Sequence, residues 1–376
     1  MPRRLVGLVG LVGLVVFAGA AALTTARPAS AQGIGAQASA LFQRYRTGDT
    51  APVIDRVSQF SERDTDSLIR ELRRRVGRWV RDAGNTEQAR LDAATFLLDV
   101  AAARMERDWL VIRDLVELGC RLVDGLPATN DRLRRWHLAA LALAQGAADS
   151  RFLLDMRRSA EAPSFAHLAH SRAKFPDEPR FLLAGAVAEG MGVTDLAPPR
   201  DREWLADEAL REQALIGRVE VSMRNDRRAR LKAFAELTTV PAVAGEAHVR
   251  AAHLAYQLND DASALEHLAA VGDARDPFVD YVRHLLTAMV QARRGARAEV
   301  EAALRRALEV VPYAQSAVEL LSAEWFLNGR EGEAHDLIDA YFARRNQAVD
   351  PWRVFGYGDF RRFPGLMQEL RSELGR

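Results

Sequence analysis

Residues 295–345 read GARAEVEAALRRALEVVPYAQSAVELLSAEWFLNGREGEAHDLIDAYFARR. One pattern of apolar and small residues fills the slots Val300, Ala303, Leu304, Ala307 and Leu308. The slots 34 residues later hold Ala334, Leu337, Ile338, Tyr341 and Phe342. The slots 36 residues earlier hold Ala264, His267, Leu268, Val271 and Gly272. A period of this size is typical of stacked helix pairs, because one pair alone cannot bury its apolar stripe.

Each copy of the pattern predicts a helical hairpin. We expect the first helices at 244–258, 277–293 and 314–327, and the second helices at 262–271, 298–310 and 332–344. A turn residue separates the two helices of each copy: Asn259, Gly295 and Gly329. Asp276-Pro277 is a good start signal, because a capping residue there precedes a proline in the first turn.

The rest of the chain also favours helix. Of the 376 residues, 48% are hydrophobic and 7% aromatic, and the abundant alanine and leucine lose little entropy in a helix. Helices are expected from Asn85, over 108–123 and from Asn130, where Gly146 weakens the end, after a flexible lead-in at 32–40. No stretch alternates apolar and polar residues for long enough to predict a sheet. The sequence therefore predicts an all-α protein.

The first 31 residues are typical of an export signal. Arg3 and Arg4 precede an apolar run over 5–23, and Ala29-Ser30-Ala31 offers small residues for cleavage before Gln32. We expect a protein of the periplasm or the extracellular space that is not an integral membrane protein after cleavage. An uncleaved anchor is the alternative, because the apolar run is nearly long enough to span a bilayer.

The charge balance argues against nucleic acid as a partner. Removing residues 1–31 takes away three arginines and no acid, so the net charge changes from +1 to about −2, and so neutral a balance is not typical of a nucleic-acid-binding protein. Cys120 is the only cysteine, so no internal disulfide can form. Its apolar flanks predict a buried, unreactive thiol.

The repeats resemble the tetratricopeptide repeat (TPR) family. The resemblance rests on the period near 34, on the Gly or Asn between the helices, and on segments such as 303–308 and 328–334. It covers about residues 244–345. The family's usual tryptophan and leucine-glycine pair are absent from the first helices, and His267 stands where other copies have Ala303 and Leu337. The resemblance implies antiparallel helical hairpins stacked in a right-handed superhelix, a TPR-like solenoid.

The resemblance also implies an inner surface lined by the first helix of each pair. Carried over to this sequence, the partner-binding residues are His253, Tyr256, Met289, Arg293, Glu319 and Phe326. Met289 and Phe326 could equally be core residues. His253 and Tyr256 are better placed for polar contacts with a protein or peptide partner.

These patterns divide the chain into five segments. We expect a signal peptide at 1–31, a degenerate helical-repeat region at 32–195, a long helical connector at 196–240, TPR-like repeats at 241–346, and an aromatic C-terminal cap at 347–376. In the cap, five aromatic residues are interleaved with three arginines. They cover the apolar end of the last repeat, or they form an exposed patch for a glycan or a peptide.

No catalytic motif, metal site or cofactor site is recognised in the chain. His167 and His170 lack a third ligand, and Ser171-Arg172-Ala173-Lys174 lacks the companion motifs of penicillin-binding enzymes. We therefore expect an exported scaffold for protein–protein interaction in a bacterial envelope, and no enzyme. The alternatives are a helical-repeat enzyme acting on envelope polysaccharide and a purely structural spacer.

Overall fold

The computed structural model describes residues 31–103, 109–152, 170–189, 227–272, 275–344, 349–356 and 358–375. Within these ranges every regular element is a helix and no strand occurs, so the all-α prediction is confirmed. None of the described helices is both long and apolar enough to cross a membrane. The export signal at 1–31 lies almost wholly outside these ranges.

An N-terminal helical bundle carries the largest core. It consists of α1 (Ala31–Arg46), α2 (Ala51–Ser58), α3 (Glu62–Asp82), α4 (Glu87–Ala102), α5 (Trp109–Val123) and α6 (Asp131–Phe152). The lead-in expected at 32–40 is instead part of α1, because Ile34 and Ala38 are buried in this core. The helices expected from Asn85, over 108–123 and from Asn130 correspond to α4, α5 and α6.

The centre of the bundle is α4, which is buried on nearly all sides. Its neighbours α5 and α6 pack on it and on each other. Gly119 of α5 lies so close to α6 that an added Cβ would fall 2.5 Å from the Trp136 ring. Gly146 was expected to weaken α6, yet α6 continues past it, and the missing side chain gives room for the ring of Phe360.

A second, smaller core joins the bundle to the repeats. The helix α8 (Pro179–Glu189) contributes Leu183 and Val187, and the helical residues 227–237 contribute Phe234. These side chains pack with residues of the first repeat helix. Most of the connector expected at 196–240 lies outside the described residues, which resume at 227.

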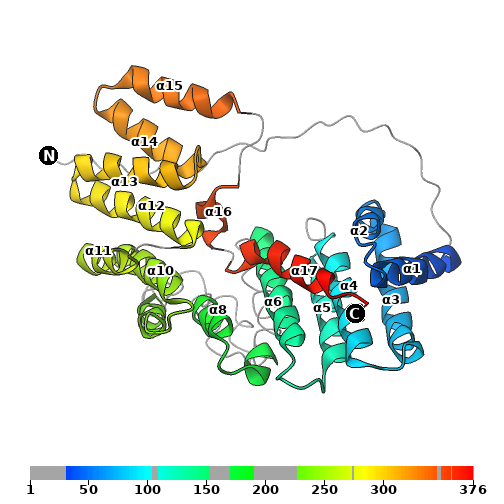
Figure 1. The fold of residues 1–376 in the computed structure, drawn as a ribbon. Helices are drawn as coiled ribbons and strands as arrows, with labels where there is room; N and C mark the ends of the chain where they lie inside the picture. The colour runs from blue at the N-terminus through cyan, green and yellow to red at the C-terminus, as the bar shows by residue number, and fades with distance from the viewer. Residues whose placement is uncertain are drawn as a thin grey trace, which may run out of the picture.

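Three consecutive hairpins follow, as predicted (Figure 1). They are α10 (Ala244–Gln257) with α11 (Asp261–Ala270), α12 (Pro277–Arg294) with α13 (Arg297–Val310), and α14 (Gln315–Leu327) with α15 (Glu331–Phe342). Every helix begins and ends within two residues of its predicted bounds. The turn residues Asn259, Gly295 and Gly329 have φ of 62°, 76° and 74°, a left-handed conformation that glycine and asparagine tolerate best.

The C-terminal tail was expected to cover the last repeat, but its described helices pack mainly on other elements. It forms α16 (Pro351–Phe355), the short 3₁₀ helix η3 (Phe360–Arg362) and α17 (Phe363–Ser372). The first of these packs on α12, η3 packs on α6, and α17 lies across α6 and α4 (Figure 1). Met367 and Leu370 are fully buried in the N-terminal core, so apolar burial holds the end of the tail on the bundle.

Candidate functional site

The first helices of the repeats carry the residues expected to bind a partner, and part of this surface contacts the chain's own tail. Backbone packing brings α16 against α12. Side chains of the tail also reach His253 and Arg250 on α10 and the backbone of Ser316 on α14. The helix α16 and its N-cap residue Asp350 therefore touch all three hairpins.

Asp350 fastens the start of α16. Its carboxylate is 3% exposed, and Oδ1 accepts hydrogen bonds from the Tyr281 hydroxyl at 3.1 Å and from the Trp352 amide at 2.8 Å. Oδ2 accepts from the Ser316 amide at 2.5 Å. Ala314, the N-cap of α14, has no polar side chain to accept a hydrogen bond. Asp350 therefore accepts from backbone amides in the first turns of both α14 and α16. Burial and the nearby carboxylate raise the pKa of Tyr281.

Aromatic rings continue the contact along α16. The rings of Trp352 and Phe355 stack with centroids 5.4 Å apart, and the His253 ring meets both edge-on at 5.3 and 5.5 Å. Arg250 donates to the Phe355 carbonyl at 3.1 Å, and its guanidinium lies 4.7 Å from that ring centroid. Burial, followed by the nearby arginines 230, 250 and 227, lowers the pKa of His253 to about 4, so the imidazole is neutral at neutral pH.

A buried charge cluster lies beside this contact. Glu246 of α10 is 3% exposed and accepts from Arg250, from Arg180 at 2.7 Å and from Arg361 at 3.0 Å. Burial alone would raise the pKa of the Glu246 carboxyl, but the three guanidinium groups outweigh it and lower the pKa to about 2. The cluster joins α8, α10 and η3.

Asp359 extends the cluster towards the N-terminal bundle. Its carboxylate accepts from Arg180 at 3.2 Å, and its amide donates to the Gln145 side chain of α6 at 2.9 Å. Burial and the neighbouring Glu246 raise the pKa of Asp359, although Arg180 opposes them. Two acids thus share one arginine where the repeats, the tail and the bundle meet.

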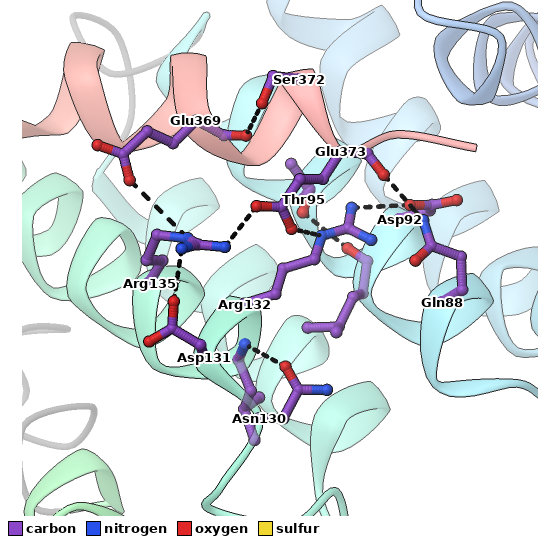
Figure 2. A network of polar contacts seen from close by, with 12 residues as sticks. Gln88, Asp92, Thr95, Asn130, Asp131, Arg132, Arg135, Glu369, Ser372 and Glu373 are labelled. Carbon is purple, nitrogen blue, oxygen red and sulfur yellow. Dashed lines mark hydrogen bonds and ion pairs between the residues drawn. The ribbon is translucent and has the colours of Figure 1, made fainter. Parts of the chain in front are cut away.

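The last helix is held by a third polar network, shown in Figure 2. Asp92 of α4 is fully buried and accepts from Arg132 of α6 at 2.8 Å and from Gln88 at 2.9 Å. Glu373, just after α17, forms an ion pair with Arg135, and its backbone carbonyl accepts from Gln88 at 3.0 Å. This network ties α17 to both α4 and α6.

A second buried acid of α4 also binds the tail. Asp99 accepts two hydrogen bonds from the Arg371 guanidinium of α17 and one from the Tyr45 hydroxyl of α1. Burial, followed by the Asp99 charge, raises the pKa of Tyr45, which stays protonated as a donor. Since Asp92 and Asp99 are seven residues apart, both lie on the side of α4 that faces α17.

The expected partner-binding residues do not form one cleft. Tyr256 and Arg293 are brought together, with the guanidinium 4.0 Å from the ring centroid, and Arg293 also bonds to Asp261 and to the Asn259 side chain. They lock the α10–α11 turn onto α12, while His253 contacts the tail. The other three are Met289, which is half-buried against the core, Glu319, which is exposed and accepts from Gln315, and Phe326, which is 52% exposed.

Two other residues singled out in the sequence, His267 and Cys120, lie among packed helices. His267 of α11 lies with its Nδ1 3.1 Å from Nδ1 of His248 on α10, which explains how a histidine fits between the helices. Burial lowers the pKa of both imidazoles. Burial also raises the pKa of the Cys120 thiol to about 12, as expected for an unreactive cysteine. His167 lies outside the described residues.

The residues that hold the tail were not identified from the sequence. A usable signal existed in two places: Asp350-Pro351 has the same form as the start signal Asp276-Pro277, and two acids seven apart interrupt the apolar face of α4. Glu246 and Arg250 give no such signal, because an acid and an arginine four apart are ordinary on a solvated helix.

Two further features bear on chemistry. An open groove of about 570 Å³ lies between α1 and α2, lined by Arg44, Arg56 and a single acid, Asp55, with apolar and amide side chains. In the described part of the chain, no three His, Cys, Asp or Glu residues are grouped to hold a metal ion.

Among known proteins, no family model and no curated sequence matches this chain.

Proposed function

We propose that this chain is an exported, TPR-like helical-repeat scaffold that binds a protein or peptide partner in a bacterial envelope. The observation that carries the proposal is the series of three stacked hairpins, each with a left-handed turn residue, whose last member leaves apolar side chains in solvent. A right-handed superhelix of the TPR type is part of the proposal. Stacked hairpins of this kind chiefly offer extended surfaces to other molecules.

The position of the tail supports a division of roles along the repeats. On α10 and α12 the tail covers the side chains around His253, whereas Glu319 and Phe326 on the last hairpin stay exposed to solvent. Two carboxyls with a shifted pKa, Glu246 (lowered) and Asp359 (raised), are buried against arginines and serve the packing of the tail. These features favour a binding role over acid–base catalysis.

Site-specific photo-crosslinking in the producing cells tests the scaffold. A photoreactive amino acid is placed singly at exposed positions on different faces, namely Arg78 of α3, Arg294 of α12 and Phe342 of α15. We expect a defined adduct with another envelope protein from at least one position. Absence of any such adduct from all positions, with the protein folded and present at normal levels, would count against a scaffold.

Export is tested separately. The mature chain purified from the envelope fraction should begin at Gln32, as read by intact mass. A mass that includes residues 1–31 in that fraction would instead indicate an uncleaved anchor, and recovery of the full-length chain from the cytosol alone would contradict export.

A further inference from the structure

We propose that the solvent side of the last hairpin, α14 with α15, docks a basic amphipathic helix of a partner protein. The proposal rests on the scaffold function above and gives its partner a chemistry and a place. It depends on three features of the hairpin: exposed apolar side chains, an excess of acid, and the end of the stack.

The apolar side chains gather on this hairpin. Of the five large hydrophobic residues that are exposed in the described part of the chain, four lie here: Leu320, Phe326, Leu327 and Phe342, which are 40%, 52%, 72% and 72% exposed. Leu320 and Leu327 are seven residues apart and so share one side of α14. Single exposed apolar residues are ordinary on a protein surface, but several on one hairpin favour a contact surface.

The same hairpin is acidic. The helices α14 and α15 contain six acids and no lysine or arginine: Glu319, Glu324, Glu331, Glu333, Asp336 and Asp339. Among the described residues, Glu333 bonds to Arg330 at the start of α15, whereas Glu319 and Glu324 bond to neutral amide groups. Asp336 and Asp339 are exposed. By contrast, the preceding hairpin mixes arginines with acids along both helices.

The negative charge of this hairpin determines which kind of partner can dock on it. A second copy of the chain, docked through the same face, would oppose acid with acid, and like charges disfavour that pairing. A partner with lysine or arginine beside its apolar stripe would be attracted instead. A helix is the matching shape, because each earlier hairpin is followed by a helix that packs on it: α12 on α10 and α11, and α14 on α13. The helix that follows α15, α16, packs on α12 instead.

The test uses two synthetic helical peptides with the purified mature protein. Both carry leucines at helical spacing; one has lysines beside the leucine stripe, and the other has glutamates at the same positions. Fluorescence anisotropy should show binding of the lysine peptide, weakened by added salt, and at least tenfold weaker binding of the glutamate peptide. Replacing both Phe326 and Leu327 with serine should weaken binding of the lysine peptide at least tenfold.

Val349 offers a matched control, because it is 71% exposed and lies outside the hairpin. Val349→Ser should leave binding of the lysine peptide unchanged. The double variant Asp336→Asn with Asp339→Asn should weaken this binding and make it less sensitive to salt. Equal binding of both peptides, or an equal effect of Val349→Ser and the double serine variant, would overturn the proposal. So would a dimer in sedimentation that the double serine variant dissociates, since the occupant would then be a second copy.

The crosslinking experiment separates this proposal from the scaffold itself. An adduct from Arg78 or Arg294 and none from Phe342 would overturn the docking face and leave the scaffold standing. Binding of the lysine peptide without any cellular adduct would support the face and count against the scaffold. An adduct from Phe342 that maps to a basic helix of the partner is the expected result.

Discussion

At the scale of single residues, Asp350 decides where the tail begins to pack. Its buried carboxylate accepts three hydrogen bonds, from Tyr281, Ser316 and Trp352. Replacing it with asparagine keeps the size and removes the charge and one acceptor, so we expect Asp350→Asn to lower the free energy of unfolding by about 2–3 kcal/mol. Urea denaturation measures this. Asp339→Asn, on an exposed helix face, should change stability by less than about 0.5 kcal/mol, and equal losses would contradict the assigned role.

A second prediction at this scale concerns pH. The folded chain lowers the pKa of His253 to about 4 from an ordinary value of 6.5, so the stability linked to this group is full above pH 6.5 and is lost as the pH falls towards 4. The loss attributable to His253 approaches about 3 kcal/mol. His253→Gln should flatten the fall in unfolding free energy over this range, as measured by urea denaturation at several pH values.

The exposed His335 serves as the control for that experiment. His335→Gln should reproduce the pH dependence of the unaltered chain, whereas His253→Gln should not. If both variants fall in stability as steeply as the parent, the neutral imidazole between Trp352 and Phe355 is not the group that responds to pH.

At the scale of elements, the approach of η3 to α6 depends on one missing side chain. A Cβ at Gly146 would lie 2.2 Å from the Phe360 ring. Gly146→Ala should therefore destabilise the protein by about 1–3 kcal/mol through overpacking, despite the better helix propensity of alanine. Gly332→Ala is the matched control, because nothing lies within 4 Å of a Cβ in that helix. It should stabilise by up to about 1 kcal/mol; a gain for both variants in thermal unfolding would refute the close approach.

Helices were the most predictable part of this molecule. The repeat helices and their turns follow from local chemistry: apolar spacing, an Asp-Pro start, and Asn or Gly where the backbone becomes left-handed. Local rules failed at Gly146 and at residues 32–40, because in both places packing against distant segments outweighs intrinsic preference. Glycine inside a helix can mark a close neighbour as well as an end.

At the scale of the whole molecule, the tail joins the repeats to the N-terminal bundle through buried polar networks. Removing residues 363–376 would expose the core residues that pack against Met367 and Leu370. It would also leave the buried Asp99 without its partner Arg371. A buried charge that loses its partner is costly, by about 3–5 kcal/mol. In hydrogen–deuterium exchange we expect faster exchange in α4 and α6, and no change in α12 and α13. Unchanged exchange in α4 would show that α17 does not stabilise the bundle.

The candidate site was predictable only in part. The resemblance to TPR repeats pointed to first-helix residues, and the structure shows that His253 contacts the tail, Tyr256 and Arg293 lock a turn, and Phe326 stays in solvent. Residues at equivalent positions of a repeat thus meet different surroundings. The surroundings of His253 come from the tail, a segment far along the chain that the pattern of one repeat cannot contain.

The sequence by itself determined the all-helical class, the bounds of the repeat hairpins and the residues at their turns, because these depend on interactions between residues a few positions apart. Only the tertiary structure decided where the tail lies. Arg371 and Asp99 are 272 positions apart, and Asp350 and Tyr281 are 69 apart. In a chain with 52 basic and 51 acidic residues, charge alone does not select a partner; apolar packing must first bring the two groups together.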